Sequence, residues 1–147
     1  MKTEFIEENQ NYVMTFEGRL DTPASLQVGR DMQVLYDCEG HDIILDCTNL
    51  EYITSSGMRL FLDLLKVAKS KGSTLFLYTD GLNEAEDAQN HLFGKKRILE
   101  VMQSAPQEPQ TLIERMKQAV ADFVGDTEQS DDLTMLMIHL PQKPNQQ

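Results

Sequence analysis

Residues 42–79 read DIILDCTNLEYITSSGMRLFLDLLKVAKSKGSTLFLYT, and this segment indicates the fold class. Ile43–Cys47 is apolar without alternation, which predicts a central strand covered on both faces. Residues 50–53 are expected to form a loop. Between residues 58 and 68 apolar side chains recur at helical spacing, and residues 74–79 form the next predicted strand. Strand, helix and strand in this order predict a right-handed parallel crossover, and therefore an α/β protein.

Upstream of this segment the sequence predicts a hairpin followed by a helix. Tyr12–Phe16 alternates large apolar side chains at period two, as a half-buried strand does. Residues 3–6 are expected to pair with it across a turn at residues 8–11. Asp21, followed by Pro23 in the first turn, indicates the start of a helix.

Downstream, two helices and one strand are expected to complete a mixed sheet of about five strands. Apolar residues at 98–102 predict a short helix, and the capping box at Thr111–Glu114 predicts a longer one. Leu133–Leu140 reads as a last strand, antiparallel to the strand over residues 74–79. Residues 141–147 form a polar tail that we expect to be flexible.

The composition excludes several classes of function. The 147 residues include 13 Lys and Arg against 24 Asp and Glu, for a net charge of −11, and both halves of the chain are acidic. Nucleic acid and anionic membranes are therefore not expected as partners. The sequence has no apolar run of membrane-spanning or signal-peptide length. Cys38 and Cys47 lack metal-ligand spacing, so we expect a reduced, cytoplasmic protein.

A pair of serines, Ser55 and Ser56, lies at the predicted start of the helix over residues 58–68. A hydroxyl at this position faces free backbone N–H groups and the positive end of the helix dipole. A phosphate attached there would be stabilised by both. The alternative is that one of these serines only caps the helix.

The segment Asp46–Met58 resembles the signature of STAS domains, the bacterial anti-sigma factor antagonists. Gly18–Asp21 is similar to an earlier motif of the same family, and the resemblance covers residues 1–78. It implies that Ser55 is the phosphorylated serine, with Ser56 as the second choice. It also implies a partner that is both serine kinase and anti-sigma factor, which binds the unmodified protein and releases the phosphorylated one.

The resemblance also implies the surface that binds this partner. The candidate residues surround Ser55 and are Asp21, Tyr52, Ile53, Thr54, Met58 and Arg59. Thr54 stands where the family pattern has an acidic residue, and this departure bears more on recognition by the kinase than on binding.

Residues 74–140 resemble a second family, the PPM-type serine phosphatases of the bacterial sporulation and stress-response branch. The motifs are Leu75–Ala85, Phe93-Gly94 and Gln129–Thr134. The resemblance implies that Asp80 and Asp131 correspond to metal ligands, and carboxylates suit Mg²⁺ or Mn²⁺. The other ligands of that family have no counterpart in residues 1–73, so we expect no cofactor, or weak Mg²⁺ or Mn²⁺ binding. The alternative for Asp131 is a solvated loop residue that caps the next strand.

These observations predict one hybrid domain over residues 1–140, STAS-like over 1–78 and phosphatase-like over 74–140. Three functions remain open: an anti-sigma factor antagonist-like module switched at Ser55, a truncated metal-dependent phosphatase, and a hybrid that has lost both roles. The STAS-like half keeps its switch serine, whereas the phosphatase-like half lacks part of its metal site. We therefore favour the non-enzymatic module, with a serine-kinase anti-sigma factor and a cognate phosphatase as candidate partners.

Overall fold

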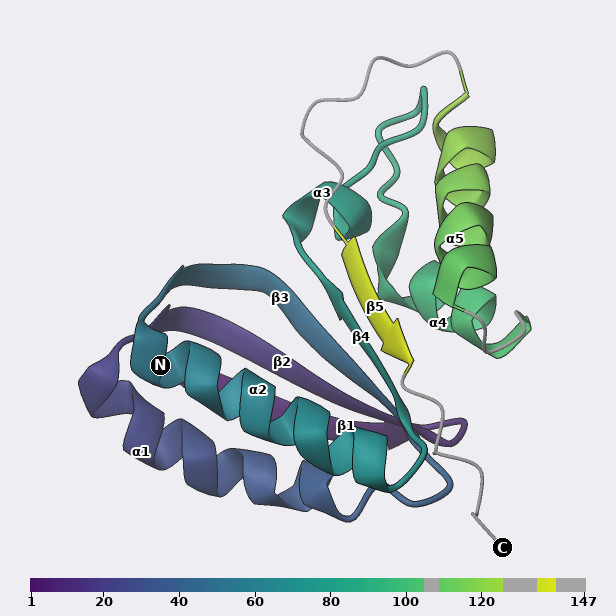
Figure 1. Cartoon of the computed structure of the whole chain (residues 1–147). Helices are drawn as coiled ribbons and strands as arrows, with labels where there is room; N and C mark the ends of the chain where they lie inside the picture. Colours follow the sequence, from purple (N-terminus) through teal and green to yellow (C-terminus); the bar gives the residue numbers. More distant parts are fainter. Residues whose placement is uncertain (105–108, 126–134, 140–147) are drawn as a thin grey trace, which may run out of the picture.

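Strands and helices alternate through most of the chain, as the sequence predicts. The computed structural model describes residues 1–104, 109–125 and 135–139 (Figure 1). Its elements are β1 (Lys2–Glu8), β2 (Asn11–Leu20), α1 (Thr22–Asp31), the 3₁₀ helix η1 (Met32–Tyr36), β3 (Asp42–Ile53), α2 (Ser55–Ser70), β4 (Thr74–Tyr78), α3 (Asp80–Asn83), α4 (Gly94–Ser104), α5 (Pro109–Val124) and β5 (Met135–His139).

The strands form one five-stranded mixed sheet in the order β1-β2-β3-β4-β5. β2, β3 and β4 are parallel neighbours, whereas β1 and β5 pair antiparallel at the two edges. The predicted fold class, the number of strands, the parallel β3–α2–β4 unit and the antiparallel last strand are therefore confirmed. Asp131 and the tail at 141–147 lie outside the described residues.

Each face of the sheet is covered by its own layer of helices. α1 and α2 lie side by side on one face, and α3, α4 and α5 cover the other (Figure 1). Neighbouring residues of a strand point to opposite faces, so Ile43 and Leu45 contact the α1–α2 layer while Ile44 contacts the α3–α5 layer. Burial on both faces explains why Ile43–Cys47 is apolar without alternation.

The local signals at the ends of the first elements are also confirmed. The hairpin between β1 and β2 turns at Asn9 and Gln10, whose φ angles are 53° and 65°. Asp21 is the N-cap of α1, because its Oδ1 accepts a hydrogen bond from the Ala24 amide at 3.0 Å. Pro23 lies in the first turn of α1, where its missing N–H costs nothing.

Two boundaries differ from the sequence prediction, and the short helix α3 (Asp80–Asn83) was not expected. Residues 50–53 were expected to form a loop, but they continue β3 to Ile53. The reason is β2, which extends to Leu20 and pairs with this part of β3 after two irregularities in the register. α5 begins at Pro109, ahead of the capping box at Thr111, because proline is favoured in a first helical turn.

Candidate functional site

The start of α2 is set by Thr54. Its backbone is extended, and its hydroxyl accepts a hydrogen bond from the Gly57 amide at 3.4 Å. Its own amide donates to the Leu20 carbonyl at 3.0 Å, which ties the end of β2 to the start of the helix. Thr54, rather than either serine, supplies the capping oxygen, so the capping role considered for Ser55 and Ser56 belongs to the residue before them.

Gly57 allows the first turn of α2 to pack closely on the sheet. A Cβ atom at this position would lie 2.7 Å from Cγ of Leu20 and 2.9 Å from Cγ1 of Ile53. Any side chain would therefore overlap atoms at the ends of β2 and β3. The glycine in the Ser-Ser-Gly motif is required by this close approach, which holds the serines at a fixed place above the sheet.

The two serines differ in their surroundings. Ser55 is exposed, at the first position of α2. Ser56 is half-buried, and its hydroxyl lies 3.1 Å from the hydroxyl of Thr22 at the start of α1. Ser56 therefore links the two helix starts, whereas Ser55 is exposed.

Several residues close to Ser55 in the sequence have exposed side chains. Tyr52 and Met58 are 45% and 44% exposed, and Arg59 is also exposed. The guanidinium of Arg19 lies over the Tyr52 ring, with Cζ 4.2 Å from the ring centroid, which is a cation–π contact. Leu62, one turn after Met58 along α2, is 52% exposed. Arg19 and Tyr52 directly precede Leu20 and Ile53, which pack in the α1–α2 layer, so the Arg19–Tyr52 pair points to the other face of the sheet.

The predicted partner-binding residues divide into two groups. Tyr52, Met58 and Arg59 have exposed side chains. The remaining residues are half-buried parts of the fold: Asp21 caps α1, Ile53 lies against Gly57, and Thr54 caps α2. Sequence reasoning missed Arg19 and Leu62. The apolar periodicity over residues 58–68 includes Leu62 and is typical of a buried face, so it did not indicate an exposed side chain, and the Arg19–Tyr52 contact depends on the pairing of β2 with β3.

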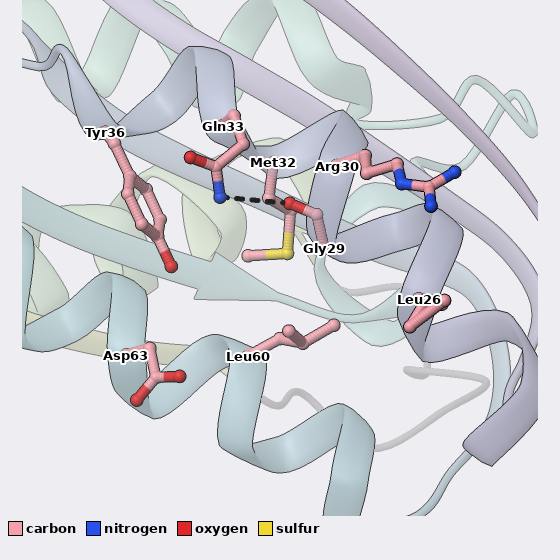
Figure 2. Close-up of a pocket in the computed structure, with 8 residues that line it drawn as sticks. All are labelled: Leu26, Gly29, Arg30, Met32, Gln33, Tyr36, Leu60 and Asp63. Atoms are coloured by element: carbon pink, nitrogen blue, oxygen red, sulfur yellow. Dashed lines mark hydrogen bonds between the residues drawn. The ribbon is translucent and has the colours of Figure 1, made fainter.

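A groove of about 460 Å³ between α1, η1 and α2 lies on the same layer (Figure 2). Its lining residues are Leu26, Gly29, Arg30, Met32, Gln33, Tyr36, Leu60 and Asp63. Gln33 donates a hydrogen bond to the Gly29 carbonyl at 3.3 Å. Gly29 allows α1 to approach α2, because a Cβ there would lie 3.4 Å from Cδ2 of Leu60. The sequence did not predict this groove.

Asp80 is the phosphatase-like candidate that the structure describes. Asp80 is half-buried and begins α3 directly after β4. Asp131, its predicted companion, lies outside the described residues. Among the residues that the structure describes, no group of three or more His, Cys, Asp or Glu side chains could hold a metal ion. The two aspartates therefore remain candidates predicted from sequence alone.

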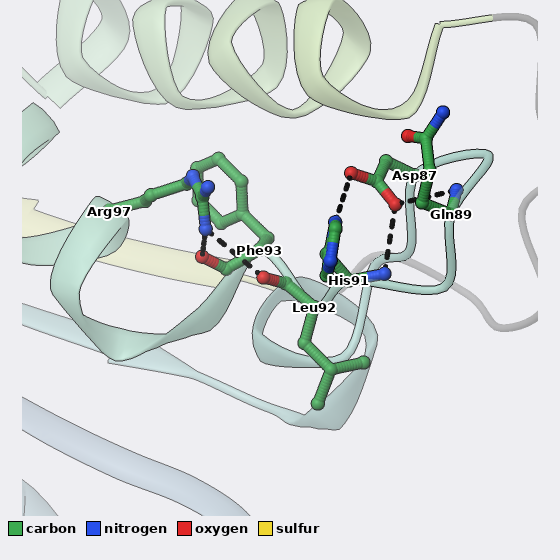
Figure 3. A network of polar contacts seen from close by, with 6 residues as sticks. All are labelled: Asp87, Gln89, His91, Leu92, Phe93 and Arg97. Carbon is green, nitrogen blue, oxygen red and sulfur yellow. Dashed lines mark hydrogen bonds and ion pairs between the residues drawn. The ribbon is translucent and has the colours of Figure 1, made fainter.

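The loop between α3 and α4 is organised by Asp87 (Figure 3). Its carboxylate accepts hydrogen bonds from the amides of Gln89 and His91, at 2.9 and 2.8 Å, and lies 3.1 Å from Nδ1 of His91. Desolvation tends to raise the pKa of Asp87, but these interactions outweigh it and hold the pKa below its usual value. Arg97 closes the loop by donating to the carbonyls of Leu92 and Phe93. These contacts are structural.

A polar pair lies buried beneath the α3–α5 layer. Asp46 and Tyr78 are register partners on β3 and β4, and both side chains are shielded from solvent. Burial, and then the negative charge of Asp46, raise the pKa of Tyr78 far above its usual range. Within the described part of the chain, the Tyr78 hydroxyl has no hydrogen-bond partner of good geometry. Tyr78 therefore stays protonated.

Comparison with known proteins identifies the family. The arrangement defines an α/β protein with a serine exposed at a helix start. The family model described as Stage II sporulation protein E (SpoIIE) matches residues 29–141, more than half of the chain. The chain therefore belongs to the SpoIIE family. This match begins upstream of residue 74, where the phosphatase-like segment was predicted to start, so the division into two family fragments stays a prediction.

The other comparisons are weaker. A solved structure of the anti-sigma factor antagonist SpoIIAA in its unphosphorylated form is 19% identical, with a TM-score of 0.45, over 52% of this chain and 71% of that chain. No curated protein gives a significant match. In the ranges that the structure describes, none of the helices has the length and apolar character that a membrane span needs.

Proposed function

We propose that this chain is an anti-sigma factor antagonist-like regulator that binds a serine-kinase anti-sigma factor and is switched by phosphorylation of Ser55. The observation that carries the proposal is that Thr54 and Ser55 have different roles at the start of α2. Thr54 caps the helix, which leaves the exposed Ser55 hydroxyl available for modification. A kinase can therefore reach the hydroxyl without opening the fold.

The neighbouring side chains explain how phosphorylation would act. Tyr52, Met58 and Arg59 are exposed and lie within four residues of the uncharged serine in the sequence. A phosphate on Ser55 would face the N-terminal amides of α2, so the helix would tolerate it. In a complex, however, the same dianion would be placed inside the interface, and binding would weaken.

The experiment uses the intact chain as bait in extract from its native cytosol. Mass spectrometry then identifies the captured proteins and tests for phosphate on Ser55. Ser55→Ala should retain the kinase partner and carry no phosphate at this position. Ser55→Asp should lose the partner while its melting temperature stays within about 2 °C of the wild type, because an acidic group is favoured in a first helical turn.

Ser70→Asp is the matched control, because it adds the same charge at the other end of α2. It should retain the partner. If Ser55→Asp unfolds the protein, Ser55 is a structural residue and the switch does not exist. If Ser55→Asp and Ser70→Asp capture the kinase equally well, phosphorylation of Ser55 does not control binding.

The second candidate function is a metal-dependent serine phosphatase, which the membership in the SpoIIE family and the place of Asp80 favour. We propose that no metal is tightly held, since two carboxylates cannot supply the roughly six oxygen ligands of Mg²⁺ or Mn²⁺. Calorimetry with Mn²⁺ tests this proposal. A dissociation constant of about 1 μM or better that Asp80→Asn abolishes would contradict it, because only a nearly complete ligand set binds so tightly. Hydrolysis of a phosphoserine peptide, lost in the same variant, would establish the phosphatase.

A further inference from the structure

His41 connects three segments at the end of the sheet farthest from Ser55. Its Nε2 lies 2.9 Å from Oε1 of Glu7 on β1, and its Nδ1 lies 3.0 Å from the Glu39 carbonyl oxygen. The ring also stacks on Tyr12 at the start of β2, with a centroid separation of 4.0 Å and an interplanar angle of 17°. One imidazole therefore contacts β1, β2 and the segment that leads into β3.

Both ring nitrogens of His41 face oxygen atoms that can only accept. A carbonyl oxygen accepts hydrogen bonds, and so does the ionised carboxylate of Glu7. Neutral imidazole carries a single N–H and can satisfy one of the two, whereas imidazolium carries two and satisfies both. The observed arrangement therefore fits the protonated form of His41 and leaves a lone pair opposed to an oxygen in the neutral form.

The charges around His41 favour the same form. Glu7 belongs to β1, while Asp37 and Glu39 precede β3. Lys71, after α2, lies 3.8 Å from the Glu39 carboxylate and partly offsets its charge. The hydrogen bond to the Glu39 carbonyl, then the hydrogen bond to Glu7, raise the pKa of His41 above its usual value.

β1 depends on the Glu7–His41 contact because few of its side chains are buried. Of its side chains only Thr3 is half-buried, and the others are exposed. Among the described residues, two side-chain hydrogen bonds join β1 to the protein beyond β2: the Thr3 hydroxyl donates to Asp31 at 2.7 Å, and Glu7 contacts His41 near the other end of the strand. Edge strands with few buried contacts are the segments that open first.

We propose that His41 is a pH-sensitive clamp that, when protonated, holds the β1–β2 hairpin against the start of β3. Since folding favours the protonated form, the clamp contributes its full stability below the ordinary histidine pKa of about 6.5. This contribution is lost as the pH rises through the higher value of the folded protein. Alkaline pH therefore loosens β1 while Ser55 and the first turn of α2, at the opposite end of β3 from the clamp, stay in place.

The first measurement is an NMR titration of the His41 ring in the full chain. Its midpoint should lie above about 6.5. Glu7→Gln should lower the midpoint, because the amide keeps the shape of the side chain and removes its charge. Glu8→Gln is the matched control: it removes the same charge from the next residue of β1 and should leave the midpoint closer to the wild-type value.

The second measurement is hydrogen exchange of the β1 amides at pH 6 and pH 8.5, corrected for intrinsic rates, with α2 amides as the internal reference. Protection of β1 should fall between these values, because neutral His41 can no longer donate to both Glu7 and the Glu39 carbonyl. His41→Gln cannot titrate and should abolish this dependence. A His41 midpoint at or below 6.5 that Glu7→Gln does not move would overturn the clamp. So would the same pH dependence of β1 protection in His41→Gln and the wild type.

Discussion

The two faces of the sheet carry candidate sites of different kinds. On the α1–α2 face, the site around Ser55 comes mainly from one continuous segment, in which β3 ends, Thr54 caps α2 and Gly57 packs on Leu20. On the α3–α5 face, Asp80 begins α3 and a buried Asp46–Tyr78 pair lies on β3 and β4, whereas the predicted companion Asp131 is distant in sequence and lies outside the described residues. In a site formed by consecutive residues, the local backbone sets the positions of the side chains. In a site formed by residues distant in sequence, those positions depend on how all the intervening elements fold.

The largest expected effect is on the reactivity of the Cys47 thiol, which reports how well the α1–α2 face excludes solvent. Burial, and then the charge of Asp46, raise the pKa of Cys47 to about 12. At pH 8 its thiolate fraction should therefore be lower than that of an ordinary cysteine by about a thousandfold. Cys38→Ser leaves Cys47 as the single thiol, whose reaction with a chromogenic thiol reagent can be followed. Native protein should react far more slowly than the same variant in denaturant; equal rates would mean that this face opens readily.

The next prediction compares two glycines of the α1–α2 layer. Gly57→Ala should destabilise the protein by about 1–3 kcal/mol, because its Cβ would overlap Leu20 and Ile53. Gly29→Ala is the matched control: its Cβ would make an ordinary contact with Leu60, and alanine favours a helix over glycine by about 1 kcal/mol. Urea unfolding of both variants measures their free energies of unfolding relative to the wild type. Equal effects of the two substitutions would show that Gly57 is not required by close packing.

The smallest expected effect concerns the other face. Tyr78→Phe removes a buried hydroxyl that has no hydrogen-bond partner of good geometry among the described residues. The variant should be as stable as the wild type or more stable, by up to about 1 kcal/mol, because the desolvation cost of the hydroxyl disappears. Tyr36→Phe, at a half-buried position in the groove, is the control. A clear loss of stability in Tyr78→Phe alone would mean that Tyr78 and Asp46 stabilise each other.

How far the sequence predicts this structure depends on whether the signals are local. Asp21 and Pro23 predict the start of α1, because a capping oxygen and a proline act within one helical turn. The loop expected at residues 50–53 was wrong because only the partner strand β2 keeps this segment extended. The Arg19–Tyr52 contact and the His41 contacts join segments distant in sequence, and no periodicity reveals them.

The pairing of β4 with β5 has a consequence for the newly made chain. β1 to β4 and the α1–α2 layer are complete when residue 78 has been synthesised, but α3, α4, α5 and β5 follow later. Until they emerge, Val13, Ile44 and Phe76 on the opposite face have no cover, and β4 is an open edge. Domains are made from the amino terminus at about 5–20 residues per second, so this interval lasts several seconds. During that time the half-made protein presents the kind of apolar, open-edged sheet that chaperones bind.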